Sequence, residues 1–274
     1  MVVKGIQASV DGRIMASADY SKSGSRIQAE EAGDLDTGIL SRGAEELGLS
    51  LTTSMLERFQ DFHRDLADWN TRMNLTSITA WGDVQTKHFL DSLSVVQATG
   101  KGFLETAKLI DIGSGGGFPG VPLKIVFPGS SATLVESTRK KAAFLSHLVE
   151  ALALEDVHIL SDRAETLAQR SDLREAFDLV LCRAVARLPI VVELTLPYCR
   201  IGGLVVVHKG SDAEEELAAS RTALKKLGGI FKEIRRVDLS GLSDDRYLIV
   251  FEKVLDSPAE YPRRPGMPAK RPLS

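Results

Sequence analysis

Hydrophobic residues recur along this chain with two different periods. From Ser50 the apolar positions follow one face of a helix, and they include Leu51, Met55 and Phe59. A second helix is expected over residues 83–98, again with apolar residues on one side. Further along, short apolar runs alternate with longer amphipathic segments, which is typical of strands and helices in turn. The pattern therefore predicts two N-terminal helices followed by an α/β sheet.

The first strand of this sheet is expected at the start of the segment LIDIGSGGGFPG, residues 109–120. Further strands are expected at residues 132–136, 157–160, 177–182, 203–208, 230–237 and 246–254. Helices are expected between them at residues 121–127, 139–152, 189–198 and 212–227. Only a short loop separates the last two strands. They should pair antiparallel, because a parallel crossover needs about a dozen residues or more.

Glycines follow the first strand directly. Gly113, Gly115 and Gly117 alternate with other residues, and Asp111 lies at the strand tip. A cofactor at the carboxyl end of a strand approaches the backbone closely, and glycine permits both this contact and a positive φ. The dinucleotide fingerprint has a wider spacing and usually an apolar residue at the strand tip. The loop therefore resembles a binding signature for S-adenosylmethionine (SAM) rather than one for NAD.

Glu136 ends the second strand, where folds of this kind place a carboxylate to accept both ribose hydroxyls. The alternative is a glycine-rich surface turn followed by an ordinary solvated glutamate, because short glycine motifs are common. Strand order and loop together predict an α/β fold, the Rossmann-like, seven-stranded class I SAM-dependent methyltransferase fold with an N-terminal helical extension.

Composition limits the function and the location of the protein. The 274 residues are 43% hydrophobic, which is enough for one substantial core and a smaller accessory element. A net charge of −3 gives no global basicity, so any contact with RNA should be local. Cys182 and Cys199 are too few and too far apart for a disulfide framework, which favours a reducing compartment. Without a visible bilayer-spanning run or signal peptide, the cytoplasm is the expected location.

Changes in composition divide the chain into four segments. We expect a flexible or unassigned extension, a helical element, the methyltransferase domain and a basic, proline-rich tail: residues 1–43, 44–100, 101–256 and 257–274. The C-terminal tail, residues 257–274, contains Arg263 and Arg264. It is either a solvated end or an arm that lies on RNA phosphates.

His88 and Asp91 lie three residues apart on one face of the second expected helix. An aspartate in this position can orient an imidazole toward a ligand. The alternative is a histidine that is only capped or paired at the surface.

A series of short motifs follows in a fixed order along the chain. The motifs are Asn74-Leu75-Thr76, His88-Phe89-Leu90-Asp91-Ser92-Leu93, the glycine loop, Lys140-Lys141 before Phe144-Leu145, Arg163-Ala164-Glu165, Arg183-Ala184-Val185-Ala186, Lys209-Gly210 and Tyr261-Pro262-Arg263-Arg264. Together they resemble the bacterial small-subunit ribosomal RNA methyltransferase G family, RsmG or GidB. The resemblance runs from about Leu51 to the C-terminus.

This resemblance implies SAM-dependent methylation of a guanine at N7, in the decoding-region loop of small-subunit (16S) rRNA. With the glycine loop, it implies a set of cofactor-binding residues: Asp111, Gly113, Gly115, Gly117, Phe118, Glu136, Ser137, Thr138, Ala164, Glu165 and Arg183. Relatives often have Asp at position 136 and Ala or Pro at position 116. Neither departure should remove the contacts.

Guanine N7 has a lone pair and no proton to lose, so alignment rather than a general base should drive catalysis. The same base edge carries O6, which suits a cationic donor. The catalytic candidates are Arg183, Lys209 and His88, and the candidates for RNA contact are Arg139, Asn74, Arg263 and Arg264. Because the product purine is cationic, we expect a carboxylate or SAM to neutralise Arg183. The alternative for each basic residue is a solvated charge at the rim.

Other methyltransferase chemistries fit the sequence less well. Exocyclic-amine enzymes share a Pro-Pro-aromatic motif after the fourth strand, where this chain has Arg183-Ala184-Val185. Cys182 and Cys199 are interpreted as structural thiols, and Asp178 lies at the wrong end of its strand for a ribose 2′-hydroxyl tetrad. The expected partner is small-subunit rRNA or the assembling subunit, with no membrane and no metal, and the chain is expected to be a monomer. A small-molecule methyltransferase and a non-catalytic ribosome-assembly factor are the alternatives.

Overall fold

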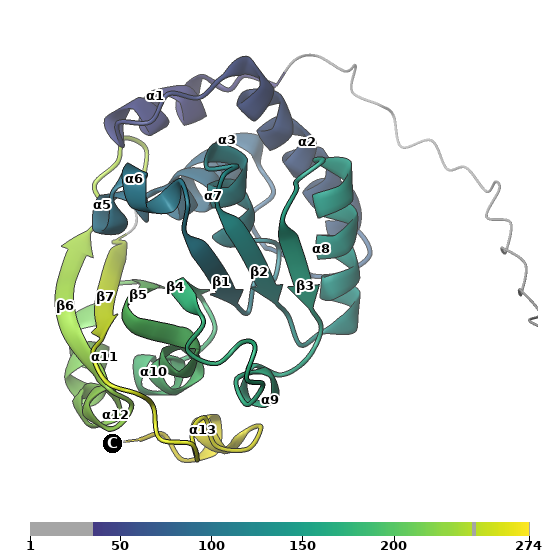
Figure 1. Cartoon of the computed structure of the whole chain (residues 1–274). Coiled ribbons are helices and arrows are strands. Elements are labelled where there is room, and N and C mark those ends of the chain that lie inside the picture. Colours follow the sequence, from purple (N-terminus) through teal and green to yellow (C-terminus); the bar gives the residue numbers. More distant parts are fainter. Residues whose placement is uncertain (1–34, 243–244, 274) are drawn as a thin grey trace, which may run out of the picture. The chain divides into compact units, whose positions relative to one another are not determined.

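The computed structural model describes residues 35–242 and 245–273 (Figure 1). Most of the extension expected at residues 1–43 lies outside these ranges. Its last part does not, because α1 (Gly38–Glu46) begins within it. The Leu40 N–H donates to Gln85 Oε1 over 2.9 Å, and Leu40 is fully buried. The expected boundary at residue 43 therefore falls inside a packed helix.

The N-terminal element is helical, as expected. After α1 it consists of α2 (Thr53–Asn70), α3 (Trp81–Val84), η1 (Gln85–Leu90), α4 (Asp91–Leu93), α5 (Val96–Thr99) and α6 (Lys101–Leu104). Thr52 caps α2 by accepting a hydrogen bond from the Met55 N–H. The single helix expected at residues 83–98 is instead a succession of short helices that includes a π-helical turn, η1. Such turns are rare and frequently mark functional sites.

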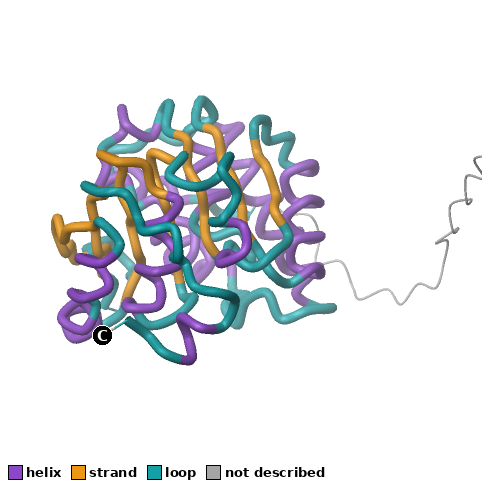
Figure 2. Tube along the Cα trace, turned by 60° about the horizontal axis from the view of Figure 1, so that its bottom comes forward, coloured by secondary structure: helices purple, strands orange, loops and turns teal. Residues whose placement is uncertain are grey.

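A seven-stranded sheet forms the centre of the domain (Figures 1 and 2). Its strands are β1 (Lys108–Ile112), β2 (Ser131–Val135), β3 (Val157–Leu160), β4 (Phe177–Arg183), β5 (Cys199–Lys209), β6 (Gly229–Arg236) and β7 (Tyr247–Lys253). The spatial order is β3-β2-β1-β4-β5-β7-β6. The first five strands are parallel, and β7 pairs antiparallel with both β5 and β6. The predicted α/β fold and its antiparallel closing pair are confirmed.

Helices connect the strands and cover the sheet (Figure 2). They are α7 (Gly120–Val126), α8 (Arg139–Ala151), α9 (Ala164–Leu167), α10 (Leu188–Thr195), η2 (Leu196–Tyr198), α11 (Ala213–Ala219), α12 (Arg221–Lys226) and α13 (Met267–Lys270). The helix expected at residues 212–227 is interrupted at Ser220, whose side-chain hydroxyl donates to the Leu217 carbonyl. A serine that bonds nearby backbone in this way competes with the regular helical pattern.

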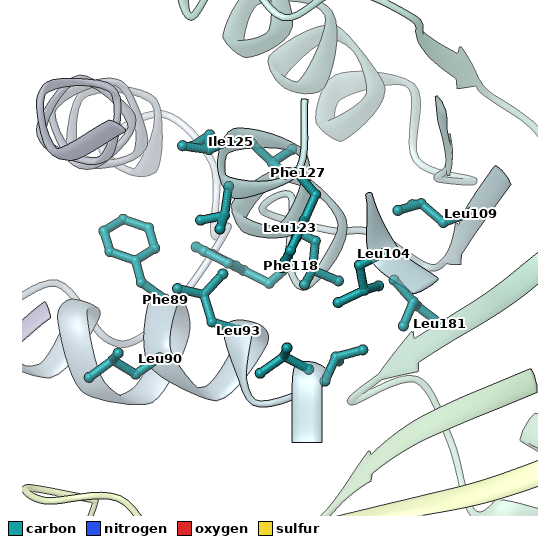
Figure 3. Close-up of a cluster of buried hydrophobic side chains, with 14 of the residues drawn as sticks. Phe89, Leu90, Leu93, Leu104, Leu109, Phe118, Leu123, Ile125, Phe127 and Leu181 are labelled. Atoms are coloured by element: carbon teal, nitrogen blue, oxygen red, sulfur yellow. The ribbon is translucent and has the colours of Figure 1, made fainter. Parts of the chain in front are cut away.

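Two clusters of buried apolar side chains pack on opposite faces of the sheet, because successive strand residues point to opposite sides. One cluster joins the N-terminal helices to α7 and to strand residues such as Leu109 and Leu181 (Figure 3). The other contains Ile110 and Val180 together with residues of α10 and α12. The N-terminal helices are thus part of the main core, and Lys87 and His88 of η1 contact Arg183 at the carboxyl end of β4.

No helix in the described ranges is long and apolar enough to span a membrane. Among the same residues, no cluster of three or more His, Cys, Asp or Glu side chains is arranged to hold a metal ion.

Candidate active site

The glycine loop leaves β1 with a backbone that only glycine adopts easily. Gly113, Gly115 and Gly117 have φ values of +78°, +55° and +92°. A Cβ at Gly113 would lie 2.5 Å from Cγ2 of Val185, which comes from the loop after β4. The glycine loop therefore packs closely against the loop that follows β4.

Asp111, at the tip of β1, is fully buried and half satisfied. Its Oδ2 accepts a hydrogen bond from the Gly120 N–H at 3.0 Å. Its Oδ1 has no hydrogen-bond partner within the described part of the chain. Burial raises the pKa of Asp111 to about 7, against the opposing effect of the Gly120 N–H. Buried polar atoms in folded proteins nearly always have a hydrogen-bond partner, so this oxygen is available to a further donor.

Glu136, directly after β2, is held beside the same loop. Its Oε2 accepts from the Gly115 N–H at 3.1 Å and its Oε1 from the Thr138 N–H at 2.7 Å. Both hydrogen bonds come from backbone, so the position of the carboxylate is determined by the fold itself. A ligand with hydroxyl groups can bind this carboxylate as a bidentate acceptor.

These residues border a cavity of about 420 Å³, which we call the central cavity. It is lined by Leu75, Thr76, Ser77, Ile78, His88, Gly113, Ser114, Gly115, Gly116, Phe118, Glu136, Ser137, Lys141, Arg183, Ala184 and Val185. Of the predicted cofactor residues, Asp111, Gly117, Thr138, Ala164 and Glu165 lie outside this lining, and Asp111 is fully buried. A Cβ at Gly117 would come within 3.1 Å of Val121 and 3.2 Å of Phe62, so this glycine permits packing.

A smaller cavity of about 90 Å³, the side cavity, shares Gly113, Ser137 and Val185 with the central one. Its wall includes the predicted pair Ala164 and Glu165 at the start of α9. The two cavities together extend from the ends of β1 and β2 toward α9. A carboxylate lies in the lining of each cavity, Glu136 in the central cavity and Glu165 in the side cavity.

Arg183 ends β4 between the central cavity and a further one, and it is held by a carboxylate. Its Nη1 lies 2.9 Å from Asp91 Oδ2. Its Nη2 donates to the Lys87 carbonyl at 2.9 Å and to His88 Nδ1 at 2.8 Å. The expectation that a carboxylate neutralises Arg183 agrees with this pairing. The interpretation of Asp91 as the partner of His88 is wrong, because Asp91 faces the guanidinium instead.

His88 uses both ring nitrogens within the protein. A guanidinium can only donate, so Nδ1 accepts from Arg183, and the proton on Nε2 is directed at Thr76 Oγ1, 2.8 Å away. The ring also stacks on Phe118 with centroids 4.3 Å apart. Burial, and then Arg183, lower the pKa of His88 to about 4. The imidazole is therefore neutral at physiological pH.

The third cavity, of about 310 Å³, lies on the other side of Arg183, and we call it the basic cavity. It is lined by Asp91, Arg183, Ala184, His208, Lys209, Gly210, Asp212 and Arg246. Lys209 Nζ lies 2.6 Å from Glu216 Oε2 and donates to the Ala186 carbonyl at 2.8 Å. His208 Nε2 donates to the Asp91 carbonyl at 3.0 Å, which leaves Nδ1 as an acceptor with no partner among the described residues.

The structure adds residues that the sequence did not single out, because His208 and Arg246 join Lys209 in the basic cavity. It also gives Asp91, which the sequence paired with His88, a different partner in Arg183. One available signal was the pairing of parallel β4 and β5, which places the residues that end them at one edge. Arg246, before antiparallel β7, gave no such signal.

The predicted RNA contacts lie farther out. Asn74 and Arg139 are exposed and are not among the residues that line the three cavities. The neighbouring Thr76, Ser77 and Ile78 reach the central cavity instead. Arg263 is bound to Glu193, whereas Arg264 is exposed. Their roles in RNA binding stay predictions.

Burial supports the exclusions made from the sequence. Both cysteines are free and buried, and burial raises the pKa of Cys182 and raises that of Cys199 to about 12. Asp178 lies near the start of β4, where it bonds the Lys108 N–H and Arg200. All three side chains are unsuited to the alternative chemistries.

The sheet order and the glycine loop at the carboxyl end of β1 define a class I SAM-dependent methyltransferase. An O-methyltransferase from Bacillus cereus, solved in complex with SAH, shares the fold with a TM-score of 0.50 and 16% identity over 70% of this chain and 91% of that one.

The family follows from closer relatives. The family model for rRNA small subunit methyltransferase G, GidB, matches residues 55–241. The ribosomal RNA small subunit methyltransferase G of Dehalococcoides mccartyi is 49% identical over 84% of this chain and 97% of its own length. The same-named protein of Halalkalibacterium halodurans is 46% identical over 84% of this chain and 96% of its own length. The chain belongs to the rRNA small subunit methyltransferase G family, and the predictions of a methyltransferase and of SAM as its cofactor are confirmed.

Proposed function

We propose that this protein methylates N7 of a guanine in small-subunit (16S) rRNA, in the decoding-region loop, with SAM as the methyl donor. The observation that carries the proposal is the position of Arg183, which separates the central cavity from the basic cavity and lines both. A cofactor in one and a base in the other meet at this side chain.

The central and side cavities fit the cofactor. Asp111 Oδ1 is a buried acceptor that a ligand ammonium group would satisfy, and Glu136 is an acceptor for ribose hydroxyls. Glu165 and Ala164 line the side cavity, where the adenine would lie. When bound, SAM supplies an electrophilic methyl group on a sulfonium. The tight backbone at Gly113 permits close approach of such a ligand.

The basic cavity offers both donors and acceptors to a guanine. Arg183 and Lys209 present donors that suit O6, which lies beside N7 on the same edge of the base. Asp91 and His208 carry buried acceptor atoms that suit the ring and exocyclic N–H groups of guanine. Because Asp91 and Glu216 already balance the two cations, the site tolerates the positive charge of the product.

The geometry of His88 agrees with methylation of an unprotonated nitrogen. Both ring nitrogens are occupied by Arg183 and Thr76, so the imidazole orients the guanidinium and is not placed to remove a proton. Transfer to N7 needs no such step, and alignment within the cavity supplies the rate enhancement.

The test is an assay for 7-methylguanine in small-subunit rRNA from a strain that lacks this protein. Borohydride reduction and aniline cleavage followed by primer extension should show loss of the modification, with recovery on expression of the wild-type chain. Gly113→Arg is the control, because its side chain would collide with Val185 and fill the cofactor cavity. If the modification persists in the deletion strain, the rRNA assignment fails.

The assay also separates the alternatives. A small-molecule methyltransferase or a non-catalytic assembly factor would leave the rRNA modification intact on deletion. Methylation of isolated rRNA and of small subunits by the purified chain, compared side by side, identifies the form of the substrate. We further propose that the chain acts as a monomer in the cytoplasm.

A further inference from the structure

The C-terminal tail is bound tightly to the domain by side chains that lie far from it in the sequence. Arg174 Nη2 donates to the carbonyls of Ser257 and Pro258, at 2.7 and 3.0 Å, and its Nη1 to that of Tyr261 at 2.7 Å. Gln169 donates to the next carbonyl at 3.0 Å. These hydrogen bonds fix the backbone of the first half of the tail.

Arg263 anchors the following turn. Its N–H and Nε donate to Glu193 Oε1, both at 2.9 Å, and its Nη2 donates to Oε2 at 2.6 Å. The Glu193 side chain is 0% exposed. Glu193 raises the pKa of Arg263 through this side-chain hydrogen bond. The guanidinium of Arg263 is thus bound within the protein, and 23% of its side chain is exposed.

Past this anchor, the tail reaches the wall of the cofactor site. The Gly266 N–H donates to Glu165 Oε1 at 2.9 Å, and Arg163 Nη2 donates to the same oxygen at 3.1 Å. Figure 1 shows α13 near α9, the helix that contains Glu165. Gly266 adopts a left-handed conformation with φ +82°, which only glycine adopts at little cost. A conformational requirement in the tail therefore determines where this N–H points.

Glu165 is nearly buried and lines the side cavity. Burial alone would raise its pKa, but hydrogen bonds from the Gly266 N–H, from its own backbone N–H and from Arg163 keep the pKa below its ordinary value. The carboxylate cannot rotate without losing these donors. Its orientation toward the cavity therefore depends on a residue of the tail.

We propose that the C-terminal tail is a positioning element of the cofactor site, in which Gly266 orients Glu165 for contact with the adenine end of SAM. This rests on the proposed assignment of the side cavity to the adenine. The tail then controls the affinity for SAM rather than the affinity for RNA, in contrast to an arm that lies on phosphates.

The test is the variant Gly266→Val, because a β-branched residue disfavours positive φ. A Cβ at Gly266 would meet no atom within 4 Å, so the change acts on the backbone rather than by collision. Loss of a hydrogen bond to a charged group should raise the Kd for SAM, measured by calorimetry, and the KM for SAM by about tenfold. The kcat at saturating SAM and the KM for small-subunit rRNA should stay unchanged.

Two further variants serve as matched comparisons. Full-length chain with Arg264, Lys270 and Arg271 changed to Ala loses exposed charge but keeps the Gly266 N–H, and it should bind SAM as the wild type does. A chain that ends at Arg264 keeps the anchor at Glu193 and should reproduce the effect of Gly266→Val. In a Glu165→Gln background, Gly266→Val should add little, because both changes act on one contact.

Three results would overturn the proposal. One is unchanged SAM affinity in both Gly266→Val and the shortened chain. Another is the same tenfold loss in the Glu165→Gln background. The third is a rise in the KM for rRNA alone, shared with the charge-removed variant, which would make the tail an RNA arm. Failure of the wild type to bind SAM would instead contradict the proposed function.

Discussion

Asp111→Asn should make the protein more stable and less able to bind its cofactor. The substitution keeps an oxygen for the Gly120 N–H, which Asp111 Oδ2 accepts at 3.0 Å, and removes a buried charge. Folding raises the pKa of Asp111 from 3.8 to about 7. At about 1.4 kcal/mol for each pKa unit, the folded state disfavours the carboxylate by about 4 kcal/mol at neutral pH.

The sign of the pH dependence follows from the raised pKa. Between pH 3.8 and about 7 the folded chain holds this proton while the unfolded chain loses it, so the contribution of Asp111 to stability falls as the pH rises. Below pH 3.8 both states are protonated, and the substitution should change little. The stabilisation by Asp111→Asn should therefore grow across this range and level off near pH 7.

Urea unfolding of both chains from pH 4 to pH 8, without ligand, measures this difference. Asp178→Asn is the control. Its carboxylate lies near the start of β4, whereas Asp111 lies near the end of β1, and it accepts hydrogen bonds from Lys108 and Arg200. Calorimetry should show at least tenfold weaker SAM binding by Asp111→Asn. Wild-type affinity should rise from pH 6 to pH 8, because a ligand ammonium favours the carboxylate. A variant that is less stable than the wild type at pH 8 would refute the reasoning.

Two more substitutions test the site, and a third, with its control, tests how the tail is bound. Arg183→Ala should lower kcat by about 100-fold with a smaller change in the KM for rRNA, because it removes a donor aligned with the base; steady-state kinetics that show only a KM effect would reassign Arg183 to phosphate binding. Glu136→Gln should weaken SAM binding by about tenfold in calorimetry through loss of a charged acceptor, and equal affinity would place the ribose elsewhere. Arg263→Ala leaves Glu193 buried without its guanidinium and should cost about 3–5 kcal/mol in urea unfolding, whereas Arg264→Ala should cost almost nothing; equal costs would contradict the anchor.

The sequence alone determined the sheet and the part of the site that depends on neighbouring residues. Alternating strand and helix periods predicted every strand of the sheet. This is possible because the faces on which a strand or helix is buried determine the spacing of its hydrophobic residues. Gly113, Gly115 and Gly117 adopt the positive φ values that their pattern after a strand predicted, because residues with a Cβ rarely adopt them. Glu136 could be found because it directly follows a strand.

Tertiary structure decided the charge pairs and the cavities. Asp91 was matched to His88 by helical spacing, but the π-helical turn at Gln85–Leu90 alters that spacing, and the folded chain brings Arg183 to Asp91. Which carboxylate a cation meets depends on strand order and side-chain packing, and neither leaves a local pattern. For the same reason the sequence did not show which residues of the domain the basic tail contacts. Only the fold brings Arg263 to a buried Glu193 and Gly266 to Glu165 at the cofactor site.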